Sequence, residues 1–370
     1  DPTTAWERRV DVSGRVDDAM RSRLGLDLAP FLTGPVGLDL AVELPRGRPD
    51  EPLVDVDADL TPAAMAVPDL GWRKPAGSAG RLTAMVHPHA APDGADEVID
   101  IKDARVDAGD LVVIGDVQLV GGQLAKAGLA RVDIGRSRLR VDYQNGGSDP
   151  DRITIRGRML DAEPLIGGTA ARDADDGDAG DGDMSDSVTV DLAVDSLRID
   201  DARRLEKVEA AATTVNGAVR RAAVQATLPV APDTGSQRGP GTVRVTIDPA
   251  AAGARNLRLD TDRMDDLMAF AGLRGYIAGG TLGITGVIDD SAGTIHVAGR
   301  FEGRDYRLMN APAIARALAT ASPSGVSDRI GGRDGVALSV LSGDFVYDDG
   351  VITLEDSRAH GSEIGVTAKG

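Results

Sequence analysis

The sequence contains no cysteine, few aromatic residues and no long uninterrupted apolar run. The missing cysteines exclude disulfides, thiol catalysis and thiolate metal sites, and they leave the cellular compartment open. The longest apolar stretch near a helix signal, Leu267 to Ala278, carries Arg274 and is too short to cross a bilayer as a helix. We therefore expect no transmembrane segment in these 370 residues.

Basic residues are also scarce relative to acidic ones. The chain has 41 Lys and Arg against 59 Asp and Glu, which gives a formal net charge of −18. Such a charge repels phosphate backbones, and no basic run with interleaved aromatics is present. The sequence therefore predicts no nucleic-acid partner.

Glutamate and lysine, which favour helix interiors, number only 10 and 5, whereas there are 49 Asp, 46 Gly and 19 Pro. Asp, Gly and Pro favour caps and turns, so we expect many short elements joined by turns. With 42% hydrophobic residues the chain can bury a core, as one large domain or two to three ordinary ones. Because it begins at Asp1 rather than Met, we interpret it as part of a longer protein.

Apolar and polar residues alternate from end to end of the chain. Period two over five to eight residues is typical of half-buried β-strands. The alternating segments are Leu38–Leu44, Val54–Leu60, Val98–Val106, Leu139–Tyr143, Ile153–Arg158 and Val188–Val194.

Turn residues separate several of these segments and predict antiparallel hairpins. They are Asn145-Gly146-Gly147, Ser291-Ala292-Gly293 and Asp348-Asp349-Gly350. The stretch Arg203–Leu228 is rich in Ala and Arg, which favours helix, but Asn216-Gly217 lies in its middle. We predict a hairpin there.

Helix signals are few and short. They predict helices over Asp17–Leu24, over Asp262–Ala271 after an Asp/Thr cap cluster, and over Ala313–Ala321 after Pro312. The glycine-dense segment Gly272–Gly280 follows the second of these and is expected to end it and lead into the next strand. Such helices cap or plug a sheet.

Motifs with known chemistry are mostly missing. The acidic segment 172–187 is interpreted as a solvated loop insertion, with calcium as the alternative, although the EF-hand spacing is not met. His87-Pro88-His89 is the one local histidine pair; the sequence marks no further zinc ligand, so we interpret it as a loop pair and predict no metal. Asp233-Thr234-Gly235-Ser236 matches the aspartic-protease tripeptide, but a single copy in a Pro/Gly loop indicates a surface turn.

No nucleophile elbow, P-loop, dinucleotide fingerprint or HExxH motif is present. We predict no catalytic residue, no cofactor and no enzymatic activity. One enzymatic alternative stays open: two of the 59 acidic residues could form the carboxylate pair of an enzyme that acts on polysaccharide.

Two blocks of the sequence resemble a known family. Val54–Pro75, which ends in Pro68-x-Leu70-x-Trp72-x-Lys74-Pro75, resembles the DUF3971 region of large AsmA-like (YhdP-like) proteins. Gly279–Gly286, Tyr306–Pro312 and Phe345–Leu354 resemble the AsmA-like C-terminal domain. The resemblance implies a DUF3971-like β-rich region over 1–170 and an AsmA-like β-groove region over 188–370. The acidic flexible insertion over 171–187 departs from the family pattern.

The resemblance also implies a fold and a function. The expected fold is mainly β, a long antiparallel, twisted and curved sheet that forms an open hydrophobic groove, with a few short helices. The expected protein lies in the periplasm, anchored to the inner membrane by an N-terminal segment outside this sequence. It resembles bridge-type lipid transfer proteins, so its expected partners are phospholipid acyl chains and, through other parts of the parent protein, the inner and outer membranes. We expect a monomer.

An open apolar sheet face needs an apolar occupant, and acyl chains gain roughly 0.8 kcal/mol per buried methylene without directional contacts. The alternation predicts groove-lining residues, which could instead face a closed core or a covering helix. These residues are Leu282, Ile284, Ile288, Ile295, Val297, Phe301, Leu338, Val340, Ile352 and Leu354. The alternative function is a periplasmic β-scaffold or chaperone that assists outer-membrane assembly, with protein in the groove.

Overall fold

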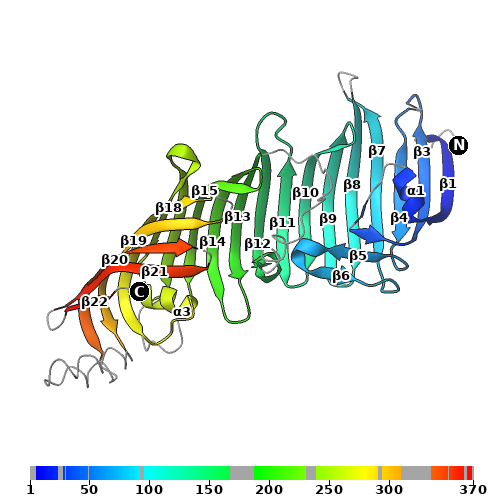
Figure 1. The fold of residues 1–370 in the computed structure, drawn as a ribbon. Coiled ribbons are helices and arrows are strands. Elements are labelled where there is room, and N and C mark those ends of the chain that lie inside the picture. The colour runs from blue at the N-terminus through cyan, green and yellow to red at the C-terminus, as the bar shows by residue number, and fades with distance from the viewer. Residues whose placement is uncertain are drawn as a thin grey trace. The chain divides into compact units, whose positions relative to one another are not determined.

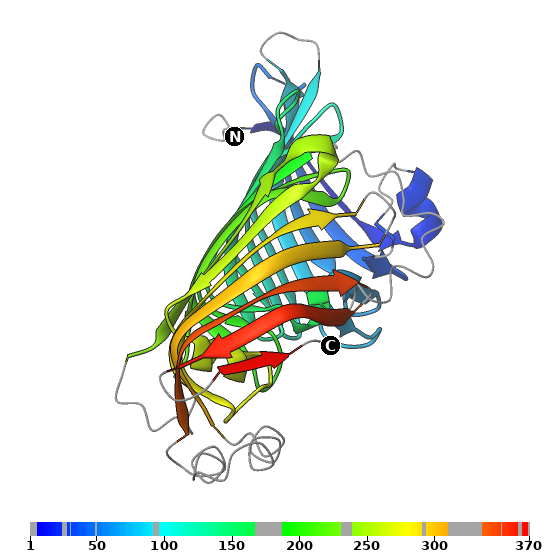
Figure 2. The same cartoon turned by 60° about the vertical axis from the view of Figure 1, so that its left-hand side comes forward.

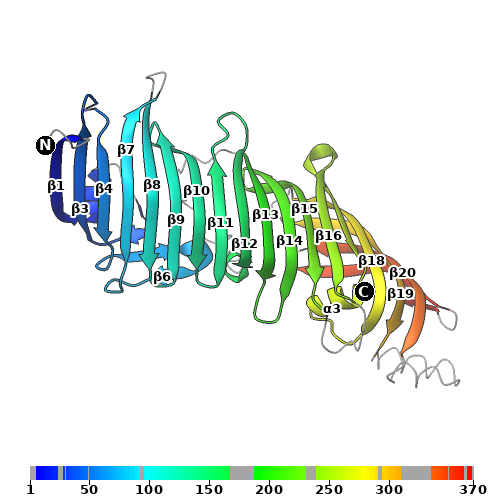
Figure 3. The same ribbon diagram turned by 180° about the vertical axis from the view of Figure 1, so that it is seen from behind.

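The computed structural model describes residues 6–23, 28–29, 31–48, 50–91, 96–166, 187–230, 239–290, 294–309, 335–348, 350–361 and 365–368. The chain divides into two compact units, Asp1–Asp201 and Ala202–Gly370, each built on a twisted β-sheet (Figures 1 and 3). The predicted mainly β fold with a few short helices is confirmed. Within the described ranges, no helix is long and apolar enough to cross a bilayer.

The main sheet of the first unit contains ten strands in its described residues, and each strand is paired with the next. In spatial order they are β1 (Trp6–Val16), β3 (Val36–Pro45), β4 (Leu53–Asp59), β7 (Arg81–Ala90), β8 (Glu97–Ala108), β9 (Leu111–Val120), β10 (Gln123–Ile134), β11 (Ser137–Gln144), β12 (Asp151–Asp161) and β13 (Ser187–Arg198).

Neighbouring strands of this sheet are antiparallel, with one exception. The predicted hairpin at Asn145-Gly146-Gly147 is confirmed as β11–β12. The predicted antiparallel sheet is therefore confirmed, and β12 and β13 form its one parallel pair among the described strands of this unit. A parallel neighbour needs a long crossover, and the connection of residues 162–186 is long enough to supply one.

A small second sheet packs on one end of the first unit's main sheet. It consists of β2 (Leu32–Thr33), β5 (Ala64–Val67) and β6 (Trp72–Lys74), with the 3₁₀ helix η1 (Pro68–Leu70) between the last two (Figure 1). Two buried clusters form beneath it. They are Val36, Ala58, Leu60 and Ala63, and Trp72, Ala108, Leu111 and Ile134.

Polar side chains tie this small sheet to its surroundings. The Trp72 indole donates a hydrogen bond to Asp110 Oδ1 at 2.6 Å. Lys74 is buried, and its ammonium donates to the carbonyl oxygens of Leu60 at 3.0 Å and Ala63 at 2.7 Å. The Trp-x-Lys spacing thus places both polar side chains where each has a hydrogen-bond partner.

The predicted helix near the N-terminus is confirmed as α1 (Asp18–Arg23). Its Arg21 is buried, pairs with Asp18, and donates to the carbonyl oxygens of Val16 at 3.3 Å and Gly34 at 2.8 Å. One guanidinium therefore connects the end of β1, the helix and the entry to β3.

The second unit has nine strands in its described residues, each antiparallel to its neighbours within the unit. They are β14 (Arg204–Val215), β15 (Ala218–Leu228), β16 (Gly241–Pro249), β17 (Arg255–Thr261), β18 (Ile277–Asp289), β19 (His296–Leu308), β20 (Val336–Asp348), β21 (Val351–His360) and β22 (Gly365–Ala368). Strands β18 to β21 are strongly curved (Figure 2).

The three remaining hairpin predictions in this unit are confirmed. Strands β18–β19 and β20–β21 pair as the turn residues indicated. The Ala- and Arg-rich stretch is the β14–β15 hairpin, whose turn residues Asn216 and Gly217 have φ of 50° and 74°. Two positive φ angles in a two-residue turn match the twist of the flanking strands, which explains why Asn-Gly overrides helix propensity at this position.

Helix α3 (Met264–Phe270) confirms the second helix prediction, and a short η2 helix (Ala251–Gly253) precedes β17. The glycine-dense segment leads from α3 into β18, as predicted. The acidic segment 172–187, except for Ser187, lies outside the described residues. So do Asp233–Ser236, Ser291–Gly293 and the predicted helix Ala313–Ala321.

The histidine pair lies in a strand, which corrects its interpretation as a loop. His87, Pro88 and His89 belong to β7. A proline is tolerated there because β4 pairs with β7 only from Arg81 to Val86, so no β4 residue requires the missing N–H at Pro88.

Candidate functional site

The two faces of the first unit's sheet differ in chemistry. The register joins one residue from each of the ten strands into a continuous cross-strand row with no charged member, which we call the first ladder. It consists of Val10, Val42, Val54, Val86, Ile101, Val117, Ala127, Tyr143, Ile153 and Val190.

The first ladder is not sealed. Val10 is 44% exposed, Ala127 is buried, and the other eight members are half-buried. Rows on the same face that lie beneath the small sheet are closed by contrast: Ala58 is 3% exposed and Ala108 is 1% exposed. The face therefore has a covered end and an open end, and the open end carries the first ladder.

Tyr143 contributes the one side-chain polar group of the first ladder. Its hydroxyl donates to Asp151 Oδ2 at 2.9 Å, and the fully buried Asp151 also accepts the N–H of Gly146 at 2.9 Å. Burial and the hydrogen bond to Asp151 raise the pKa of the Tyr143 phenol. The ring therefore belongs to the apolar row while its hydroxyl is held by a buried carboxylate.

The opposite face of the same strands is polar and carries ion pairs. Arg81 Nε donates to Asp57 Oδ1 at 2.8 Å, and Arg9 Nη1 contacts Glu43 Oε1 at 2.9 Å. Exposed ion pairs of this kind contribute little stability, but their charged side chains make this face of the sheet polar and well solvated. The sheet is therefore one-sided, with a single apolar face.

A shallow hollow of about 700 Å³ lies on the polar face, and Asp11, Asp39, Asp55, Asp57 and Asp103 are among its lining residues. It is where a carboxylate pair for polysaccharide cleavage would be sought. The hydrogen bond from Arg81, however, lowers the pKa of Asp57. A general acid needs a raised pKa, so Asp57 does not suit that role.

The second unit has a comparable row, which we call the second ladder, across β14 to β21. It consists of Ala212, Ala222, Ile247, Leu257, Gly286, Gly299, Phe345 and Leu354. Leu354 is exposed and the other members are half-buried. The Phe345 ring lies over Gly299, where a Cβ atom would come within 2.8 Å of it.

Helix α3 covers part of this face. Met264, from α3, packs in a buried cluster with Leu282, Tyr306, Val336 and Leu338, and Ile284 and Phe301 contact its edge. This corner is a closed core of the second unit.

The structure places the predicted groove residues in three environments. Leu282, Ile288, Val297 and Leu338 are buried; Ile284, Phe301 and Val340 are half-buried; Ile295, Ile352 and Leu354 are exposed. Leu282, Ile284, Phe301 and Leu338 come together at the cluster that contains Met264, which is the covering-helix arrangement that the sequence had left open. Leu354 is the one predicted residue that belongs to the second ladder.

No family model matches this chain, and neither a curated protein nor a solved structure matches it.

Sequence reasoning named no lining residue in the first unit. The signal was present, because Val54–Leu60, Val98–Val106 and Ile153–Arg158 were recognised as alternating strands. What was missing was the register that aligns their apolar residues in one row.

Proposed function

We propose that the chain is a non-enzymatic lipid-binding segment that holds phospholipid acyl chains against the apolar face of its sheets. The observation that carries this proposal is the first ladder, an uncharged row across ten strands whose members remain partly exposed. Monomeric soluble proteins rarely leave so extended an apolar row without an occupant.

The dimensions of the first ladder suit hydrocarbon. Ten strands about 4.8 Å apart span roughly 43 Å. An extended acyl chain is roughly 15 Å long, because it spans about half of a bilayer hydrocarbon core that is roughly 30 Å thick. The row is therefore long enough for more than one acyl chain end to end. Its valine and isoleucine side chains offer dispersion contacts without directional demands.

The resemblance of Val54–Pro75 and Phe345–Leu354 to AsmA-like proteins supports the physiological setting. We place the chain in the periplasm, as part of a protein anchored to the inner membrane that moves phospholipid between the inner and outer membranes. The parent protein's other parts would provide the membrane contacts, and the chain acts as a monomer.

The test compares two adjacent substitutions in β7. Val86 lies in the first ladder between Val54 and Ile101, whereas Met85 faces the other side between Asp55 and Lys102. Val86→Asp puts a charge where acyl chains would lie, and Met85→Asp adds the same charge to the polar face. Native mass spectrometry of the purified chain should show bound phospholipid for the wild type and Met85→Asp, and a several-fold loss for Val86→Asp.

Far-UV circular dichroism checks that both variants keep the sheet. Equal phospholipid on the two variants, or none on the wild type under gentle conditions, would overturn the proposal. A photo-crosslinker at Val54 adds a second readout: lipid adducts agree with it, and peptide adducts would favour a chaperone instead.

A further inference from the structure

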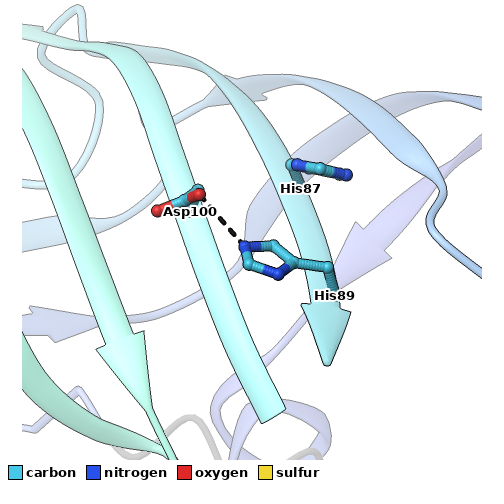
Figure 4. Close-up of side chains that lie close together, drawn as sticks. All are labelled: His87, His89 and Asp100. Atoms are coloured by element: carbon cyan, nitrogen blue, oxygen red, sulfur yellow. Dashed lines mark hydrogen bonds and ion pairs between the residues drawn. The ribbon is translucent and has the colours of Figure 1, made fainter. Parts of the chain in front are cut away.

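The polar face of β7 and β8 carries three neighbouring side chains of the types that bind metal ions. His87 and His89 come from β7 and Asp100 from β8, and all three are half-buried (Figure 4). One ligand atom from each lies within 4.8 Å of the others. The strand register explains this, because His87 pairs directly with Asp100 and alternation brings His89 to the same face.

Hydrogen bonds orient the His89 ring. Its Nδ1 lies 3.0 Å from the carbonyl oxygen of Ala90, an acceptor that the ring can meet only with an N–H. In the neutral ring, Nε2 then carries a lone pair, and this atom lies 3.2 Å from Asp100 Oδ2. Nε2 and Oδ2 therefore share either a proton, as in an imidazolium–carboxylate pair, or a metal ion that takes the place of that proton.

A second hydrogen bond orients the carboxylate. Gln118 Nε2 donates to Asp100 Oδ1 at 2.9 Å, which leaves Oδ2 directed toward His89. Metal-binding histidines usually donate their other ring N–H to a carbonyl or carboxylate, and metal-binding carboxylates are usually held by a further hydrogen bond. Both contacts are present around these side chains.

The spacing fits a tetrahedral ion. Two ligands about 2.0–2.1 Å from a tetrahedral zinc ion lie roughly 3.3 Å apart. The separation of His89 Nε2 and Asp100 Oδ2 is already close to that value. The rings of His87 and His89 are 5.0 Å apart, so His87 has to approach by a small side-chain rotation.

We propose that His87, His89 and Asp100 bind a divalent ion of the zinc class, with water completing the coordination. Two imidazoles and one carboxylate favour such an ion over Mg²⁺ or Ca²⁺, which prefer oxygen ligands alone. Because the ligands come from both β7 and β8, the ion would cross-link these strands near their connecting turn. The site lies on the polar face, so it does not depend on lipid binding at the first ladder.

The test is zinc binding by the full chain, measured by competition with a chromophoric chelator. Excess Mg²⁺ is included because it competes for sites made of carboxylates alone, which the acidic sequence of segment 172–187 could offer. We expect one tight equivalent of zinc per chain, and at least a roughly tenfold loss of affinity in His87→Ala, His89→Ala and Asp100→Asn. Co²⁺ should give the visible absorption of a tetrahedral site, and the variants should lose it.

His296→Ala is the matched control, since His296 Nδ1 lies 3.8 Å from Asp348 Oδ2 as a single histidine–carboxylate pair. It should bind zinc as the wild type does. The melting temperature of the wild type, measured with and without zinc, gives a second test that does not depend on the folding of any variant. Zinc that binds only the folded chain raises this melting temperature. The absence of zinc binding in excess Mg²⁺, or an affinity unchanged in His87→Ala and His89→Ala, would overturn the proposal.

Discussion

Phe301 and Gly343 lie directly opposite each other on β19 and β20, and the end of the Phe301 ring fills the space above the glycine. A Cβ atom on Gly343 would come within 2.7 Å of Phe301 Cζ and within 2.9 Å of the Cα atom of Ser357. Two residues along the strands the arrangement is reversed, because Gly299 faces Phe345. Ring and glycine thus alternate between the two strands, which lets a curved apolar face carry aromatic rings without crowding.

This relationship predicts that Gly343→Ala destabilises the second unit by about 1–3 kcal/mol, the usual cost of overpacking. Gly283→Ala is the control, because the nearest atom to its Cβ would be Asp260 Oδ1 at 3.5 Å, an ordinary contact. Chemical denaturation of both variants measures the difference. Equal midpoints would show that the Phe301 ring moves aside at no cost.

The buried ammonium of Lys74 leads to a second prediction. Lys74→Met keeps the aliphatic stem but leaves the carbonyl oxygens of Leu60 and Ala63 without this donor. An unsatisfied buried acceptor costs about 1–3 kcal/mol, so we expect a loss of roughly 2–5 kcal/mol in unfolding free energy. Arg73→Met, at the exposed neighbouring position in β6, should change stability little. If the two variants unfold alike, the small sheet is held by its apolar contacts alone.

A third prediction concerns lipid stoichiometry. Because the first ladder is long enough for more than one acyl chain end to end, native mass spectrometry should detect species with more than one phospholipid per chain. Charges placed at opposite ends, as in Val42→Asp and Ile153→Asp, should each remove part of the bound lipid, and together most of it. A single lipid that is lost completely in either variant would indicate one local pocket.

The sequence was sufficient to predict the strands that alternate clearly or flank a recognisable turn, because alternation and turn chemistry act over a few residues. The hairpin at Asn216-Gly217 shows this clearly, since the turn residues outweighed the helix propensity around them. The parallel neighbour of β12 was not predictable, because it depends on where the long connection 162–186 leads. Strands β5 and β6 were also missed as separate elements, since they are too short to show a period.

The candidate site was less predictable than the fold. Asp103 has a φ of 50° and lies where the pairing of β8 shifts register with both β7 and β9, and such a bulge interrupts the simple alternation of faces along a strand. Period-two counting therefore assigns faces correctly only between bulges. The metal-binding group depends in the same way on register, since Asp100 is distant from His87 in sequence and adjacent to it across the strands.

The last prediction concerns pH and the N-terminus of α3. Asp265 is buried and contacts Arg263 Nε at 3.1 Å and the Gly279 N–H at 2.8 Å. Burial alone would raise the pKa of the Asp265 carboxyl, but the hydrogen bonds and charge of Arg263, together with the backbone N–H groups, hold it below its ordinary value. The stabilisation from this carboxylate is therefore complete above the unfolded pKa of about 3.9 and is lost as the pH falls through the folded value.

Asp265→Asn should cost roughly 3–5 kcal/mol at neutral pH, because it deprives the buried Arg263 of one of its charged partners. The variant should also lose less stability than the wild type between about pH 5 and pH 2. Asp260→Asn, which removes the carboxylate of an exposed pair with Arg258, is the control and should keep the wild-type profile. Urea denaturation across this pH range measures all three proteins. If the unfolding free energies of Asp265→Asn and the wild type fall in parallel as the pH is lowered, the acid sensitivity arises elsewhere in the chain.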